Sequence, residues 1–294
     1  MYQQTLFGDD QLTRVVNVAS VPQRSPFRYP GGKTWLIPLI RRWLWNKKTR
    51  PIELIEPFAG GGIVGLTVAA ENLAAHVTLV ELDDEIGAVW RTVLGPEAKW
   101  LAEKILSFKL SREVLHNELA RTPNSVREKA FQTILKNRTF HGGILAPGSR
   151  PLKNGENGKG VLSRWYPGTL ARRILNIRAI HDRITFIEGD GIDAISQSAK
   201  RSGVAFFIDP PYTASGKRAG TRLYRHFDLD HPKLFHLVGK VSGDFLMTYD
   251  DAPGVRDLAR EQRFETELVA MKNTHHAKMS ELLIGRDLKW ARSR

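Results

Sequence analysis

The residues best suited to chemistry lie in one run, where the apolar stretch 204–208 is followed by Asp209, Pro210, Pro211 and Tyr212. The apolar stretch is typical of a buried strand. Two consecutive prolines cannot donate to a sheet, and each fixes φ near about −65°, so the strand must end at Asp209 in a rigid turn. A carboxylate, prolyl carbonyls and an aromatic ring then stand at the carboxyl end of a strand, where ligands bind in open α/β sheets. A plain strand-ending turn is the alternative.

A strand, a glycine loop and a helix precede this run and are typical of a nucleotide-type site. Residues 52–56 predict the strand and residues 63–70 predict an apolar helix. The loop between them reads Pro57-Phe58-Ala59-Gly60-Gly61-Gly62. Its Phe-x-Gly-x-Gly spacing differs from the dinucleotide pattern G-x-G-x-x-G. That difference speaks against NAD and favours another adenosine-bearing ligand.

Two further places could hold parts of the same ligand. Residues 77–80 predict a strand that ends at Glu81, about 20 residues past the glycine loop, the offset expected for a carboxylate that binds a ribose diol. A solvated acid is the alternative. Upstream, Gly31 and Gly32 precede Lys33 and an apolar helical segment. Glycines and free N–H groups at a helix start favour a closely bound anion, and Lys33 could reach a carboxylate or phosphate. No Walker A pattern is present, and a simple turn is the alternative.

A glycine-rich and basic stretch opens at Asn137 and runs to about Trp165. Between Lys136 and Arg178 the only acid is Glu156. A loop of this length inside a compact domain is usually functional or disordered, and its mixture of basic, amide and aromatic residues suits phosphate and base contacts. We therefore predict a DNA-recognition insert, with a merely flexible loop as the alternative. The predicted DNA-binding residues are Lys136, Asn137, Arg138, Arg150, Lys153, Lys159, Arg164, Trp165 and Tyr166.

The composition agrees with a polyanionic partner. The chain has 44 lysines and arginines against 31 acids, a net charge of +13, and such an excess favours nucleic acid through the release of condensed counterions. Cysteine is absent, which excludes disulfides, thiolate metal ligands and cysteine nucleophiles, and no metal site is predicted. No apolar run approaches the ~18 residues that a membrane span needs, and no signal peptide is visible. We therefore expect a cytoplasmic protein.

Five of these sequence pieces, in this order, resemble the Dam-like branch of the S-adenosylmethionine-dependent DNA adenine-N6 methyltransferases, the D12 class with the alpha motif order. The matching pieces are Tyr29-Pro-Gly-Gly-Lys33, Glu56-Pro-Phe-Ala-Gly-Gly-Gly62, Val80-Glu81-Leu82, Asn137-Arg138 with the glycine-rich stretch, and Asp209-Pro-Pro-Tyr212. The resemblance spans roughly residues 25–285. It implies a DNA partner, S-adenosylmethionine as cofactor, and a bacterial or phage-infected cell in which the protein is nucleoid-associated.

The resemblance also implies a fold, a domain organisation and a set of cofactor-binding residues. We expect a Rossmann-like methyltransferase sheet, mostly parallel with a C-terminal antiparallel hairpin, plus an inserted target-recognition domain. The catalytic domain would comprise residues 25–90 and 181–294, the insert residues 91–180, and a mobile arm residues 1–24. The implied cofactor-binding residues are Tyr29, Gly31, Gly32, Lys33, Phe58, Gly60, Gly62, Glu81, Asp190 and Asp209. Among them, Lys33 would lie near the methionine carboxylate, Glu81 at the ribose hydroxyls and Asp190 near the adenine.

The implied catalytic residues are Asp209, Pro210, Pro211 and Tyr212. Asp209 and the Pro210 carbonyl would accept the two N–H groups of the flipped adenine, and Tyr212 would stack on the base. Cytosine-C5 methylation requires a cysteine nucleophile and is excluded. Cytosine-N4 methylation remains the near alternative, although that group usually has serine in place of Asp209. A non-catalytic DNA-binding protein that keeps the fold is the other.

Two protein partners are predicted. The segment Gln3-Gln4-Thr5-Leu6-Phe7 resembles the short motif by which bacterial proteins dock on the replication sliding clamp, and a featureless tail is the alternative. A restriction endonuclease would be the partner if the enzyme serves restriction-modification, as opposed to an orphan role.

Overall fold

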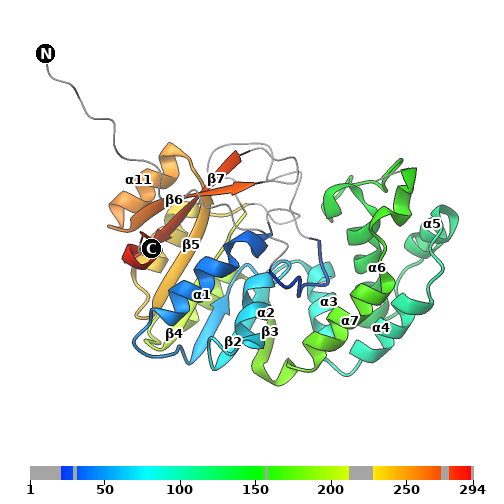
Figure 1. The fold of residues 1–294 in the computed structure, drawn as a ribbon, viewed down its shortest axis with the longest axis horizontal. Coiled ribbons are helices and arrows are strands. Elements are labelled where there is room, and N and C mark those ends of the chain that lie inside the picture. Colours follow the sequence, from blue (N-terminus) through cyan, green and yellow to red (C-terminus); the bar gives the residue numbers. More distant parts are fainter. Residues whose placement is uncertain (1–20, 29–31, 156–157, 212–227, 273–277, 293–294) are drawn as a thin grey trace, which may run out of the picture.

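The computed structural model describes residues 21–28, 32–155, 158–211, 228–272 and 278–292. Its centre is a seven-stranded sheet of order β3-β2-β1-β4-β5-β7-β6 (Figure 1). The strands are β1 (Glu53–Glu56), β2 (His76–Glu81), β3 (Ile184–Glu188), β4 (Val204–Ile208), β5 (Asp244–Asp250), β6 (Glu265–Lys272) and β7 (Lys278–Gly285). Strands β1 to β5 pair in parallel, whereas β7 runs antiparallel to β5 and β6. The predicted mostly parallel sheet with a C-terminal hairpin is confirmed.

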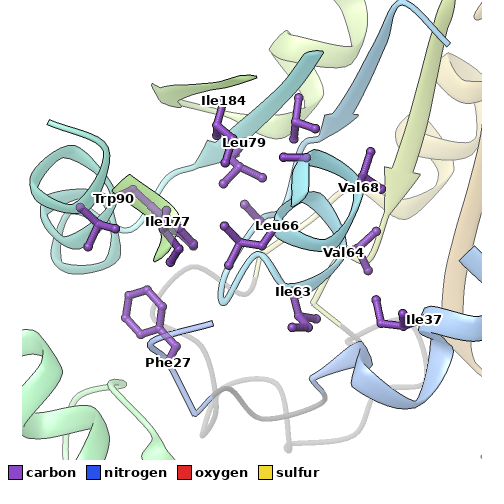
Figure 2. Packing of buried hydrophobic residues seen from close by; sticks show 14 of the residues in the cluster. Phe27, Ile37, Ile63, Val64, Leu66, Val68, Leu79, Trp90, Ile177 and Ile184 are labelled. Atoms are coloured by element: carbon purple, nitrogen blue, oxygen red, sulfur yellow. The ribbon is translucent and has the colours of Figure 1, made fainter. Parts of the chain in front are cut away.

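Helices cover both faces of the sheet, as its apolar strands require. In β4, Ala205 and Phe207 pack into a cluster with α1 (Ile37–Trp45), α2 (Ile63–Ala70) and α3 (Asp84–Leu94). Figure 2 shows part of this cluster around Leu66 and Leu79. The alternate β4 residues Val204, Phe206 and Ile208 pack on the other face against α8 (Gly191–Ser198), α10 (His231–Gly239) and α11 (Pro253–Glu261). The period of two along a strand therefore supplies two hydrophobic layers.

A group of helices lies at one end of the molecule, on the far side from the β6–β7 hairpin (Figure 1). Its members are α4 (Ala98–Ser107), α5 (Arg112–Ala120), α6 (Val126–Thr139) and α7 (Pro167–Arg178). Buried residues of α4, α6 and α7 belong to the same hydrophobic cluster as α2 and α3. The segment predicted as an insert is thus helical and shares its core with the sheet, and its role as a target-recognition domain stays a prediction.

The remaining elements are short. They are the 3₁₀ turns η2 (Lys33–Leu36), η3 (His141–Gly143), η5 (Gly160–Arg164) and η6 (His181–Arg183), together with α12 (Lys289–Arg292). None of the helices among the described residues is long and apolar enough to cross a membrane. The clamp-like segment Gln3–Phe7 and most of the predicted arm lie outside the described residues, as do the predicted site residues Tyr29, Gly31 and Tyr212.

Candidate active site

Acidic side chains gather at the carboxyl edge of the sheet because parallel strands all end there. Glu56 ends β1 and Glu81 ends β2, while Asp209 follows β4 directly. Strand β7 runs the other way, so it brings Glu281 to the same edge from near its beginning, opposite Asp250 of β5. Four carboxylates from distant parts of the sequence therefore lie at the edge where a ligand is expected.

Lys33 links two of these carboxylates. Its Nζ lies 3.0 Å from Asp209 Oδ1 and 3.4 Å from Glu281 Oε2, and its side chain is only 3% exposed. Thr248, at the carboxyl end of β5, donates a hydrogen bond of 2.7 Å from Oγ1 to the same Asp209 oxygen. The Asp209 carboxylate is therefore held in one orientation by two donors, which is the preorganisation that a catalytic acceptor requires.

Glu281 and Thr248 were not among the residues predicted from the sequence. The only local signal was a single carboxylate in the apolar run Ser280–Gly285, and Glu281 is buried together with the apolar residues that follow it. Thr248 carries no such signal, since a threonine inside a strand is ordinary. Both residues become part of the site only because β5 lies between β4 and β7.

The glycine loop after β1 has the tight geometry that its sequence predicts. Gly60 and Gly62 have φ of +45° and +60°, a region that residues with a side chain rarely adopt. A Cβ on Gly62 would lie 2.8 Å from the ring of Trp90, whose Nε1 donates a 3.0 Å hydrogen bond to Gly60 O. Trp90 of α3 therefore holds the loop in place, at a position where the loop backbone can approach a ligand closely.

Glu81 accepts hydrogen bonds from three backbone N–H groups. Oε2 accepts from Gly60 at 2.7 Å, and Oε1 accepts from Leu82 at 2.9 Å and from Asp83 at 3.0 Å. Burial nevertheless raises the pKa of Glu81 to about 7. A carboxylate has about four acceptor positions, so Oε2 keeps capacity for a further donor such as a ribose hydroxyl. The predicted ribose contact fits this geometry.

Glu56 is a second perturbed carboxyl, and it too was not predicted as a site residue. It is fully enclosed, and its Oε2 accepts a 2.7 Å hydrogen bond from Gly65 N. Burial raises its pKa to about 8, and the negative charges of Asp209 and Glu81 add to the increase despite the Gly65 bond. Clustered carboxyls with raised pKa values are typical of functional sites.

Asp190 and Phe58 lie together at the end of the predicted cofactor site. Asp190 follows β3 and caps α8, accepting from Ile192 N at 2.6 Å. The next residue, Gly191, is packed so closely that a Cβ would lie 2.2 Å from Pro57 O and 2.9 Å from the Phe58 ring. The loops after β1 and β3 are therefore in contact, as a single adenosine-binding surface requires.

The predicted DNA-binding residues divide into an exposed and a buried group. Arg150, Lys153, Lys159 and Tyr166 are exposed, and Arg164 is half-buried. Lys136 forms an ion pair with Glu85 at 2.7 Å. The buried group comprises Asn137, Arg138 and Trp165. These three side chains lie inside the protein and not on the surface that direct DNA contact requires.

The buried group has structural contacts instead. Trp165 packs edge-on against Phe108 with ring centroids 6.1 Å apart. Asn137 and Arg138 form hydrogen bonds with the backbone of residues 26–28. The sequence around Asn137 and Arg138 is basic and rich in glycine, which suggests an exposed loop. Their burial follows from the packing of α6, whose residues around them are nearly all buried.

The strand order 3-2-1-4-5 with an antiparallel seventh strand, the glycine loop after β1 and the acid at the end of β2 are those of a Rossmann-like methyltransferase fold. A model of the D12 class N6 adenine-specific DNA methyltransferase family matches residues 29–143. This match agrees with the family that the sequence resembles, and it supports the expected enzyme class and S-adenosylmethionine as methyl donor. The glycine loop and Glu81 are the described residues that fit that cofactor.

Solved structures match the chain at low sequence identity and with low TM-scores. A SAM-dependent methyltransferase from Agrobacterium tumefaciens is 11% identical with a TM-score of 0.40, over 86% of this chain and 61% of that one. An rRNA methyltransferase from Streptomyces viridochromogenes is 13% identical with a TM-score of 0.41, over 88% and 86% of the two chains. No curated protein matches the chain by sequence.

Proposed function

We propose that the protein transfers a methyl group from S-adenosylmethionine to N6 of an adenine flipped out of duplex DNA. The observation that carries the proposal is the Asp209 carboxylate, held by Lys33 and Thr248 at the carboxyl end of β4. A carboxylate followed by a prolyl carbonyl offers two adjacent acceptors, which match the two N–H groups of an exocyclic amine. The family match supports adenine as the base.

The chemistry follows from how these acceptors act on the amine. The adenine nitrogen is a poor nucleophile because its lone pair is delocalised into the ring. Hydrogen bonds to Asp209 and to the Pro210 carbonyl favour tetrahedral geometry at N6 and align it for attack. Bound S-adenosylmethionine supplies a methyl group activated by its sulfonium. The N–C bond forms as the S–C bond breaks, and the methylated amine then releases a proton.

The remaining residues serve the two ligands. Glu81, Phe58, Asp190 and the glycine loop would bind the cofactor, with Lys33 at its carboxylate. The exposed basic residues Arg150, Lys153 and Lys159 would contact DNA phosphates, and Tyr166 offers an exposed aromatic ring. Tyr29, Gly31 and Tyr212 keep the roles that the resemblance implies. Docking of Gln3–Phe7 on a sliding clamp and a restriction endonuclease partner likewise remain predictions.

The direct test is transfer of a labelled methyl group from S-adenosylmethionine to DNA that was grown in a methylation-free host. We expect N6-methyladenine, and mapping the modified bases would give the recognition sequence. Finding N4-methylcytosine would favour the cytosine alternative, and no transfer to any DNA would favour a non-catalytic binding protein. Asp209→Ala should abolish transfer and leave DNA binding largely intact, whereas Asp228→Ala, at an exposed aspartate, should have no effect.

A further inference from the structure

One buried side chain connects the helical region to the chain that leads into the active site. Asn137 of α6 donates from Nδ2 to Arg28 O at 2.9 Å and to Gly143 O at 2.8 Å, and its Oδ1 accepts from Arg28 N at 2.7 Å. A single amide thus satisfies both backbone groups of Arg28. It also joins Arg28 to the turn that opens the glycine-rich stretch.

Two arginines of the helical region strengthen this connection. Arg138 of α6 donates to Pro26 O, and Arg173 of α7 donates to Ser25 O at 3.1 Å. Gly143 is also in direct contact with the segment, since a Cβ there would lie 2.4 Å from Arg28 O. Residues 25–28, which we call the N-terminal segment, are therefore fixed to α6 and α7 through the carbonyl groups of Ser25, Pro26 and Arg28.

The other side of the N-terminal segment contacts the cofactor loop. Ser25 Oγ donates to Gly61 O at 2.5 Å. Phe27 packs against Trp90 with ring centroids 5.8 Å apart (Figure 2), and Trp90 in turn donates to Gly60 O. Two neighbouring carbonyl groups of the glycine loop, those of Gly60 and Gly61, are thus bonded by Trp90 and by Ser25 of the N-terminal segment.

The same segment leads along the chain to Lys33. Only four residues separate Arg28 from Lys33, whose ammonium group lies 3.0 Å from Asp209. A shift of Arg28 would reach the glycine loop through Ser25 and Phe27.

We infer that Asn137 is a positioning residue that couples DNA binding to cofactor binding. The inference rests on the proposed function and adds a path by which the DNA site and the cofactor site are coupled. DNA that binds the glycine-rich stretch shifts Gly143. The hydrogen bonds of Asn137 to Gly143 and to Arg28 then shift the N-terminal segment as well. By linkage, the cofactor must then strengthen DNA binding by the same factor by which DNA strengthens cofactor binding.

The test measures this coupling factor in Asn137→Ala and Ser25→Ala. The affinity for S-adenosylhomocysteine is determined with and without saturating linearised plasmid DNA, which contains most short sequences. We expect a factor of about 5 or more in the natural protein, the range of ordinary allosteric coupling, and less than about 2 in both variants. Matched controls are Asn117→Ala and Ser196→Ala, at exposed positions of α5 and α8, which should keep the natural factor.

The coupling factor separates a positioning role from a merely structural one. Simple loosening of the loop would weaken S-adenosylhomocysteine binding equally with and without DNA and leave the factor unchanged. If Asn137→Ala does not fold, Ser25→Ala decides alone, because it removes one hydroxyl. An unchanged factor in the folded variants, or a factor of one in a natural protein that binds DNA, overturns the inference only. Failure of the natural protein to bind or methylate DNA overturns the proposed function as well.

Discussion

The replacement Glu56→Gln tests the electrostatics of the site most directly. Burial raises the pKa of Glu56 to about 8 in the folded protein, whereas an unfolded glutamate has a pKa of about 4.3–4.5. Between these two values the folded state binds the extra proton, so stability falls as pH rises through this window. From pH 5.5 to pH 8.5 this one carboxyl should cost about 3 kcal/mol of unfolding free energy, an order-of-magnitude figure from the pKa difference.

Glutamine keeps the acceptor for Gly65 N and cannot ionise, so the variant should lose this part of the pH dependence. The assay is urea unfolding of both proteins at pH 5.5 and pH 8.5, with the free energies compared between them. We expect the variant to be the more stable protein at pH 8.5 and to lose about 3 kcal/mol less over the range. Glu113→Gln on the exposed face of α5 is the control and should follow the natural protein. Equal pH slopes for Glu56→Gln and the natural protein would show that Glu56 is ionised when folded, contrary to the reasoning.

Three further predictions concern catalysis and binding. Thr248→Val removes a donor to Asp209 worth ~1–2 kcal/mol, so kcat should fall about 5- to 30-fold while Thr248→Ser stays active. An equally impaired serine variant would point to packing instead. Because the pKa of Glu81 is about 7 and a ribose hydroxyl needs its ionised form, cofactor affinity by calorimetry should fall roughly tenfold per pH unit below 7. Glu81→Gln should bind weakly at every pH, and a variant with natural pH dependence would exclude Glu81 as the ribose ligand. Lys153→Ala should reduce the slope of log affinity for DNA against log salt concentration by about 1. The control Lys240→Ala, at an exposed lysine outside the glycine-rich stretch, should leave the slope unchanged. If Lys153→Ala has the slope of the natural protein, Lys153 does not contact DNA.

Local sequence patterns were sufficient for the elements that carry the site. The predicted helix 63–70 coincides with α2, and the predicted strands 52–56, 77–80 and 204–208 agree with β1, β2 and β4 within about two residues, because buried strands are short apolar runs ended by glycine, proline or an acid. Helices α8 and α11 were not predicted. Both are short, and α11 is a charged surface helix with few buried residues.

The place of Asp209, Glu81 and the glycine loop also followed from the sequence. Parallel strands end at one edge, so residues that follow such strands must meet there whatever their separation along the chain. The family resemblance was carried by these same residues, and the match over residues 29–143 includes the glycine loop and Glu81. The role of Asp209-Pro210-Pro211 as an acceptor pair is a proposal that the methyl-transfer assay tests.

Tertiary structure alone decided which polar residues face a ligand and which hold the protein together. Asn137 and Arg138 stand in a basic stretch, yet α6 packs between α3 and α4, and its buried amide and guanidinium must find partners inside the protein. Likewise, Lys33 meets Asp209 and Glu281 only because β5 and β7 complete the sheet beside β4. Sequence patterns over a few residues predict which residues are buried and where the chain turns. Hydrogen-bond partners and pKa shifts arise from groups that are distant in the sequence and that only the packed fold brings together.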